Sequence, residues 1–109
     1  MSTRDQRRAP RKAIDAGVIA IDAIVEQPFG NLCNLSSAGL MTIGSRMPRS
    51  EGIYQVRLQL PDGSGNIEVG LQEQWHEPAG GGGQYWAGYR IIAISTAHGE
   101  LLERWLRQQ

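Results

Sequence analysis

Two neighbouring segments alternate apolar and polar residues, and this pattern constrains how the middle of the chain can fold. The first, IYQVRLQL, covers residues 53–60. The second covers residues 66–75, and its apolar side consists of Ile67, Val69, Leu71 and Trp75. The Pro61-Asp62-Gly63 sequence between them favours a turn, because proline fixes φ and glycine accepts positive φ. A period of two places alternate side chains on opposite faces of a strand, so residues 56–71 are predicted to form a β-hairpin.

Other segments have the composition of strands, and the last segment has that of a helix. Strands are predicted within residues 17–26, 29–35, 40–43 and 84–94, with a break at Pro28. Near the C-terminus the apolar residues recur with helical spacing, at Leu101, Leu102, Trp105 and Leu106. This helix is expected to begin near Ser95 or Thr96. Five or six short antiparallel strands and one helix predict an all-β fold, a small barrel or sandwich whose open end or edge the helix covers.

Composition limits the class of protein. The chain has 109 residues, of which 40% are hydrophobic and 20% charged, so one globular domain is expected. No stretch approaches the roughly 18 apolar residues of a membrane-spanning helix, and no secretory signal is visible. The single cysteine, Cys33, excludes an internal disulfide framework. We therefore expect a cytoplasmic protein that does not insert into membranes.

The formal net charge is zero, but the charges are unevenly distributed. Residues 1–12 contain five basic residues and one acidic residue, a net +4, whereas the rest contains six basic and ten acidic residues, a net −4. We therefore divide the chain into a flexible basic N-terminal arm over 1–12 and a barrel with its helix over 13–109. Such an arm commonly contacts phosphate groups, but incidental charge on a solvated terminus explains it equally well.

The sequence carries no motif that indicates an enzyme. It lacks a Gly-x-Gly-x-x-Gly motif, a phosphate-binding loop and a serine nucleophile elbow. The only histidines, His76 and His98, form with Cys33 at most a weak set of metal ligands. We therefore expect no catalytic activity, no metal and no cofactor.

Two polar clusters have the chemistry of a ligand-binding site. The first is Arg7-Arg8-Ala9-Pro10-Arg11, in which the proline biases the chain toward an extended form. Each guanidinium is a rigid fork that matches phosphate oxygens and the O6/N7 edge of guanine. The arm can therefore contact a guanine nucleotide at both its base and its phosphate.

The second cluster is Asn34-Leu35-Ser36-Ser37-Ala38-Gly39-Leu40. It places an amide and a hydroxyl two residues apart, hence on one face of a strand. Gly39 permits either a positive φ or a close backbone approach. Taken alone, the cluster is also typical of a turn in which Asn34 and Ser36 satisfy local backbone groups.

Together, and in this order, the two clusters resemble the motifs of PilZ domains, Arg-x-x-x-Arg followed by Asp/Asn-x-Ser-x-x-Gly. The matching residues are Arg7 and Arg11 in the first motif and Asn34, Ser36 and Gly39 in the second. The Arg7-Arg8 doublet and the late WAGYRI strand before a helix are also similar. The resemblance covers essentially the whole chain, from about residue 5 to residue 107.

PilZ domains are bacterial receptors for cyclic di-GMP, built as a six-stranded antiparallel β-barrel with one C-terminal α-helix. The resemblance implies that fold and a ligand site. In that site Arg7 and Arg11, with Arg8, would grip guanine edges and phosphates, and Asn34 and Ser36 would contact a guanine. Gly39 would let the backbone approach the ligand. The arm is expected to become ordered around the nucleotide.

The resemblance also implies a mode of signalling. A receptor without a second domain is expected to act on an unidentified effector protein, and the outputs of the family include motility, biofilm formation and virulence. Gln6 stands where relatives that bind an intercalated nucleotide dimer often have arginine. Arg4 or Arg8 could take the place of that arginine, so one and two nucleotides per protomer both remain open.

Trp75 has two interpretations. An aromatic residue at the end of the predicted hairpin strand can stack on an exposed guanine. Alternatively, it belongs to the core, in phase with Ile67, Val69 and Leu71.

Two other functions stay open at this point. One is a PilZ-like protein-interaction module without nucleotide binding. The other is a small barrel that binds single-stranded nucleic acid through its basic arm. The acidic body and the few candidate stacking aromatics argue against the second, so we expect no nucleic-acid partner.

Overall fold

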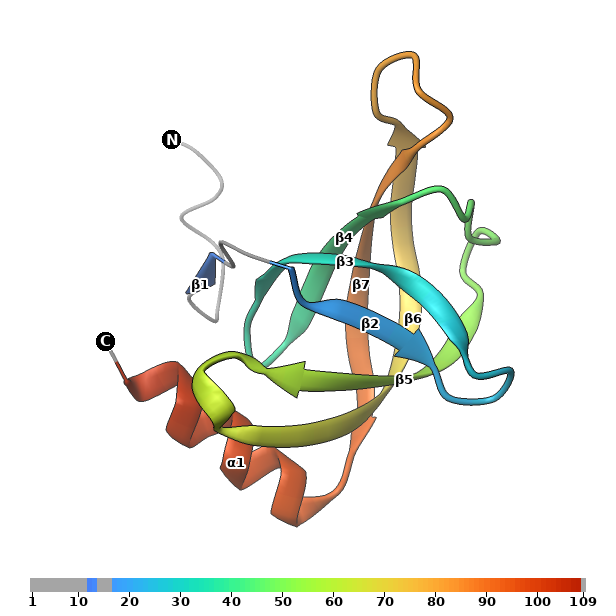
Figure 1. Cartoon of the computed structure of the whole chain (residues 1–109). Helices are drawn as coiled ribbons and strands as arrows, with labels where there is room; N and C mark the ends of the chain where they lie inside the picture. Colours follow the sequence, from blue (N-terminus) through green and yellow to red (C-terminus); the bar gives the residue numbers. More distant parts are fainter. Residues whose placement is uncertain (1–11, 14–16, 109) are drawn as a thin grey trace, which may run out of the picture.

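The computed structural model describes residues 12–13 and 17–108 (Figure 1). Its strands, in chain order, are β1 (Lys12–Ala13), β2 (Ile19–Asp22), β3 (Gln27–Leu35), β4 (Gly39–Gly44), β5 (Ile53–Leu60), β6 (Gly65–Pro78) and β7 (Tyr85–Ile94). A short 3-10 turn, η2 (Pro61–Gly63), joins β5 to β6, and the helix α1 (Thr96–Arg107) follows β7.

Six of these strands form a closed antiparallel barrel. Around the ring, β3 pairs with β2, β2 with β5, β5 with β6, β6 with β7, β7 with β4, and β4 again with β3. The two-residue β1 pairs with the end of β3. Closure leaves few backbone groups unpaired at strand edges. The predicted fold, a six-stranded antiparallel barrel with one C-terminal helix, is therefore confirmed.

The predicted hairpin over 56–71 forms as part of the β5–β6 pair, but the beginning of the chain differs from prediction in two places. The strand expected over 17–26 ends at Asp22. The carboxylate of Asp22 accepts hydrogen bonds from the N–H groups of Ile24 (2.9 Å) and Val25 (3.3 Å), and these bonds stabilise a turn in place of further strand. Pro28 does not interrupt the strand but lies within β3, next to a register shift in the β2–β3 pair. Such an irregularity tolerates a residue without a backbone N–H.

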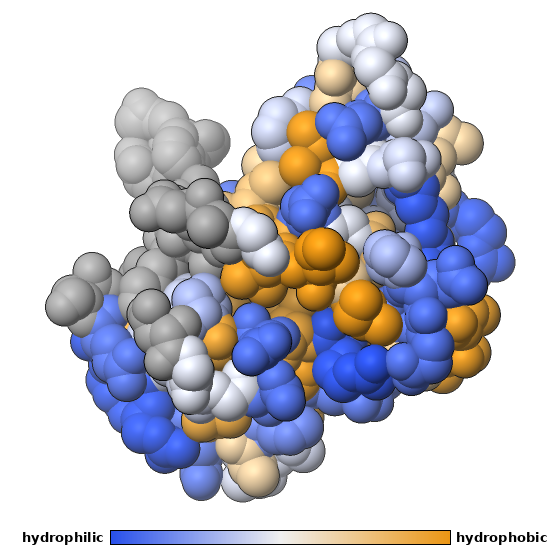
Figure 2. Space-filling view, in the orientation of Figure 1, coloured by the Kyte–Doolittle hydropathy of each residue, from blue (hydrophilic) through white to orange (hydrophobic). Residues whose placement is uncertain are grey.

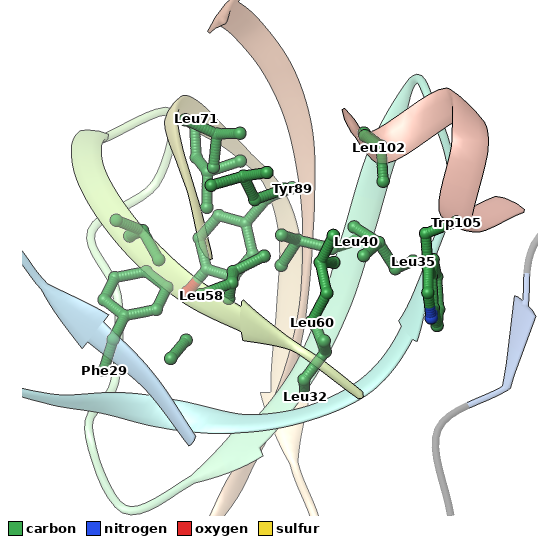
Figure 3. Packing of buried hydrophobic residues seen from close by; sticks show 14 of the residues in the cluster. Phe29, Leu32, Leu35, Leu40, Leu58, Leu60, Leu71, Tyr89, Leu102 and Trp105 are labelled. Atoms are coloured by element: carbon green, nitrogen blue, oxygen red, sulfur yellow. The ribbon is translucent and has the colours of Figure 1, made fainter. Parts of the chain in front are cut away.

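The interior of the barrel is filled by alternate residues of its strands and closed at one end by α1. The outward side of α1 is largely hydrophilic (Figure 2). Leu102 and Trp105 of the helix, each 2% exposed, belong to the same buried cluster as Leu35 and Leu40 (Figure 3). The helix begins after Ser95, as expected, and the Ser95 hydroxyl accepts a hydrogen bond from the N–H of His98. Within residues 12–13 and 17–108, no helix has the length and apolar character needed to span a bilayer.

An aromatic cluster lies away from the helix, and Figure 3 shows two of its members, Phe29 and Tyr89. The rings of Phe29, Tyr54 and Tyr89 lie with their centroids 5.1 to 6.2 Å apart. The guanidinium of Arg46 lies over the rings of Phe29 and Tyr54 and forms an ion pair of 2.8 Å with Asp22. These contacts anchor the loop between β4 and β5 to the barrel.

Candidate functional site

A row of four paired residues crosses the outer face of the barrel from β3 to β6. Asn34 pairs with Met41, Met41 with Gly88, and Gly88 with Trp75. Directly paired residues project on the same face of a sheet. Because neighbouring strands lie about 4.8 Å apart, this outer row (Asn34, Met41, Gly88 and Trp75) spans about 14 Å. The row beside it is buried and faces the interior, and consists of Leu35, Leu40, Tyr89 and Glu73.

Asn34 forms the β3 end of the outer row. Its side chain is half-buried, and its amide Nδ2 lies 3.9 Å from the Sδ of Met41. On the other side of β3, Ala13 of β1 pairs with Asn34. The predicted arm residues Arg7, Arg8 and Arg11 lie outside the described residues. The segment that follows them in the chain, β1, thus meets the outer row at Asn34.

Ser36 does not share a strand face with Asn34, contrary to prediction. Strand β3 ends at Leu35, and Ser36, only 2% exposed, begins the turn to β4. Its hydroxyl accepts hydrogen bonds from the N–H groups of Ala38 and Gly39, both at 3.1 Å, and donates to the carbonyl oxygen of Gly39 at 3.2 Å. The hydroxyl therefore shapes the turn beside the outer row, which is the local backbone role that the sequence left open.

Gly39 is needed for a close approach of two strands and not for a positive φ. Its φ lies outside the left-handed region, and it pairs with Arg90 of β7. A Cβ atom at this position would collide with the backbone carbonyl oxygen of Tyr89. The glycine of the motif thus lets β4 pack directly against β7, which carries Gly88 of the outer row.

Trp75 lies on the outer face, so of its two interpretations the one that places it in the core is wrong. The side chain is 43% exposed, although Ile67, Val69 and Leu71 are fully buried. The cause is a register shift in the β6–β7 pair between Glu73 and Trp75, which reverses the alternation of faces. The indole lies against Gly88, where a Cβ atom would collide with its Nε1. An exposed aromatic surface is thereby presented at the β6 end of the outer row.

Sequence reasoning missed a buried carboxylate two residues before Trp75. Glu73 is 3% exposed and accepts hydrogen bonds from the Glu51 N–H (2.7 Å) and from Nδ1 of His76 (2.6 Å). Burial would raise the pKa of Glu73, but these two hydrogen bonds outweigh it and hold the pKa below its ordinary value. Glu73 continues the apolar phase of Ile67, Val69 and Leu71, so the alternation itself could have indicated an inward carboxylate.

Sequence reasoning also missed apolar neighbours of the outer row. Ile43 pairs with Trp86 on the same outer face, two residues along β4 and β7 from Met41 and Gly88. Both side chains are half-buried. Together with Trp75, they give this face an apolar, aromatic character suited to stacking a planar base.

One exposed cation also borders the outer row. Arg90 pairs with Gly39 across β4–β7, and its guanidinium donates a hydrogen bond of 3.0 Å to the side chain of Gln72. A second cation, Arg46, is held elsewhere by Asp22 and by the aromatic cluster. Arg90 is therefore better placed than Arg46 to meet an anionic ligand on this face.

The described part of the chain brings together no group of three or more His, Cys, Asp or Glu side chains that could hold a metal ion. His76 bonds to Glu73, whereas Nδ1 of His98 accepts a hydrogen bond from the N–H of Glu68 at 3.0 Å. The two histidines thus serve separate structural contacts. What the face offers is a surface for binding, made of an amide, a thioether and aromatic rings.

Comparison with known proteins identifies the fold. No protein-family model and no curated protein sequence matches the chain. Among solved structures, the chain is similar to the inhibitor of motility MotI/DgrA of Bacillus subtilis, with a TM-score of 0.70 and 15% identity over 93% of this chain and 50% of that one. It is also similar to MrkH of Klebsiella pneumoniae, solved in complex with cyclic di-GMP, with a TM-score of 0.73 and 14% identity over 92% of this chain and 50% of MrkH. The chain spans about half the length of these two proteins.

Proposed function

We propose that this chain is a PilZ-type receptor that binds cyclic di-GMP and passes the signal to another protein by direct contact. The observation that carries the proposal is the outer row, in which the motif residue Asn34 and the exposed Trp75 lie on one continuous face. The barrel shares its fold with a protein solved in complex with this nucleotide and with an inhibitor of motility. The first likeness supports cyclic di-GMP as the ligand, and the second supports a role in the control of motility.

In the proposed complex, the ligand lies across the outer row and the basic arm covers it. Asn34 hydrogen-bonds a guanine edge, and Trp75 provides a stacking surface worth about 1–3 kcal/mol per base. Arg7, Arg8 and Arg11 contact the phosphates and the O6/N7 edge of guanine. Ser36 and Gly39 act through the turn that sets β4 against β7.

The arm is the part that couples binding to signalling. Ordering a backbone residue costs about 1–2 kcal/mol, so the contacts of the arginines must exceed that cost for the arm to close. A surface formed by the closed arm would then exist only with nucleotide bound, and an effector protein that recognises this surface would respond to the ligand.

Isothermal titration of the purified protein with cyclic di-GMP at physiological salt tests the proposal. GTP, cyclic di-AMP and a single-stranded oligonucleotide serve as competing ligands. Selective binding of cyclic di-GMP at micromolar or better affinity is expected, and its stoichiometry decides between one and two nucleotides. Absence of binding at two temperatures would instead identify an interaction module without nucleotide. Stronger binding of the oligonucleotide, with a steep salt dependence, would identify a nucleic-acid-binding barrel.

A further inference from the structure

Strand β6 reverses its faces at one point, and that reversal exposes Trp75. Before the shift, Glu73 faces the interior and pairs with Tyr89. After it, Trp75 pairs with Gly88 on the outer face and His76 pairs with the buried Ala87. Without the extra residue, regular alternation would turn Trp75 inward and His76 outward.

One side-chain contact spans the shift. The buried carboxylate of Glu73 and the imidazole Nδ1 of His76 lie 2.6 Å apart, one on each side of the irregular segment. Because a carboxylate only accepts hydrogen bonds, the imidazole nitrogen is the donor. The contact can form only while both side chains face inward, which is the arrangement that leaves Trp75 outside.

The same carboxylate is fixed from a second direction. Its other oxygen accepts the N–H of Glu51, and the N–H of Glu73 donates to the carbonyl oxygen of Gly52 at 2.9 Å. The segment at Glu51 and Gly52 therefore holds Glu73 in place. The hydrogen bond from His76 then fixes the part of β6 after the register shift relative to Glu73.

The loop between β6 and β7 could accommodate a shift of β6 by one residue along β7, which would remove the irregularity before Trp75. Between β6 and β7, Gly80–Gly83 form a loop in which Gly80 and Gly83 have positive φ. A Cβ atom added at any of these four positions would meet no atom within 4 Å. A shift of β6 by one residue can therefore be absorbed there, and strand geometry alone does not secure the position of Trp75.

We infer that the Glu73–His76 pair is a positioning device that keeps Trp75 on the outer row, available to stack on a bound base. The inference rests on the proposed function for the identity of the base. Glu73 and His76 are positioning residues, because both face the interior and act on the ligand through Trp75.

The test combines a substitution with a matched control. His76→Leu removes the donor to Glu73, whereas His76→Gln retains an N–H donor. His98→Leu is the matched control, because it removes the other histidine hydrogen bond of the described residues, 3.0 Å long, which His98 of α1 accepts from the N–H of Glu68 of β6. Each variant is made with and without Trp75→Ala, and cyclic di-GMP affinity is measured for all.

The binding experiment has a specific expected pattern. Loss of one stacking contact weakens binding roughly five- to hundredfold, so Trp75→Ala and His76→Leu should each fall in that range. His76→Leu should add nothing in the Trp75→Ala background, and His76→Gln should restore most of the affinity. Equal effects of His76→Leu and His98→Leu, or a full effect of His76→Leu without Trp75, would overturn the inference.

A ligand-free measurement separates this inference from the proposed function. A nuclear Overhauser contact between the Trp75 indole and the α-protons of Gly88 is expected in the wild type, in His76→Gln and in His98→Leu, and should be lost in His76→Leu. Its persistence in His76→Leu would overturn the inference. If the wild type binds no cyclic di-GMP, the proposed function fails, and this measurement alone decides whether the pair positions Trp75.

Discussion

The hydroxyl of Ser36 and the backbone of Gly39 exchange hydrogen bonds in both directions across one tight turn. Ser36 Oγ accepts from the Gly39 N–H at 3.1 Å and donates to the Gly39 carbonyl oxygen at 3.2 Å, while the Ser36 N–H donates to that oxygen at 2.9 Å. The two motif residues therefore form a structural unit that joins β3 to β4.

Replacing Ser36 by alanine is expected to destabilise the fold. The change leaves the N–H of the buried Gly39 without its acceptor, which costs about 1–3 kcal/mol. Urea unfolding measures the effect, and Ser37→Ala, at an exposed neighbouring position, is the control and should stay within about 0.5 kcal/mol of the wild type. Equal stabilities of the two variants would show that the Ser36 hydroxyl does not support the turn.

Two glycine substitutions are expected to impair different properties, the stability of the fold in one case and ligand binding in the other. Gly39→Ala places a methyl group against the rigid carbonyl of Tyr89, so a loss of about 1–3 kcal/mol in unfolding free energy is expected. In Gly88→Ala, the atoms nearest to the new methyl group all belong to the side chain of Trp75, which can move. We therefore expect Gly88→Ala to retain stability but to displace the indole, increase its quenching by acrylamide and weaken cyclic di-GMP binding. Gly82→Ala, in an open loop, should change neither property.

Much of the fold could be predicted because it depends on local patterns. The alternation of residues 53–60 and 66–75 and the turn sequence between them determine the β5–β6 hairpin. The change to helical spacing after Ser95 likewise predicts α1. In both segments burial of one face follows directly from the period of the apolar residues.

The placement of the candidate site could be predicted only in part, because it depends on contacts between distant segments. Alternation places Trp75 in the core, and only the register shift in the pair with β7 reverses this. Ser36 leaves the strand face because β3 ends at Leu35, where the turn to Gly39 begins. The close approach of Gly39 to Tyr89 joins residues 50 positions apart, and no local pattern contains it.

Two buried carboxylates are expected to make the fold sensitive to acid. Burial alone would raise the pKa of both Asp22 and Glu73. The pKa of Asp22 is instead lowered by Arg46 and by hydrogen bonds from two backbone N–H groups. The pKa of Glu73 is lowered by the N–H of Glu51 and by His76. Because both folded pKa values lie below the ordinary values of 3.8 and 4.5, the unfolded chain takes up protons first as the pH falls. This stabilisation is present above about pH 5 and is lost as the pH falls through the folded values.

Urea unfolding between pH 6 and pH 3 measures this dependence. Glu73→Gln is expected to unfold more easily than the wild type at pH 6 but to lose less stability between pH 5 and pH 3. Glu77→Gln, which alters an exposed carboxylate nearby, should follow the wild-type curve. If Glu73→Gln lost as much stability as the wild type over the same range, Glu73 would not be a source of the acid sensitivity.

Removal of residues 1–11 is expected to separate folding from ligand binding. The barrel consists of β2 to β7 and is closed by the pairing of β3 with β4. Among the described residues, no residue of the arm therefore takes part in the closed ring of strands. The shortened chain should therefore keep its thermal unfolding midpoint within a few degrees, as followed by circular dichroism. In titrations it should lose cyclic di-GMP binding, because the arginines proposed to bind phosphate and guanine are removed.

Single substitutions refine this expectation. Arg7→Ala and Arg11→Ala should each weaken binding about five- to hundredfold, the effect of losing one bidentate contact worth about 1–3 kcal/mol. Arg57→Ala is the control, because Arg57 lies on β5 and its guanidinium pairs with Glu26 away from the outer row. This variant should bind cyclic di-GMP as tightly as the wild type. If both arm variants and the shortened chain bound as tightly as the wild type, the arm would not belong to the site, and Asn34 and Trp75 would have to bind the nucleotide without it.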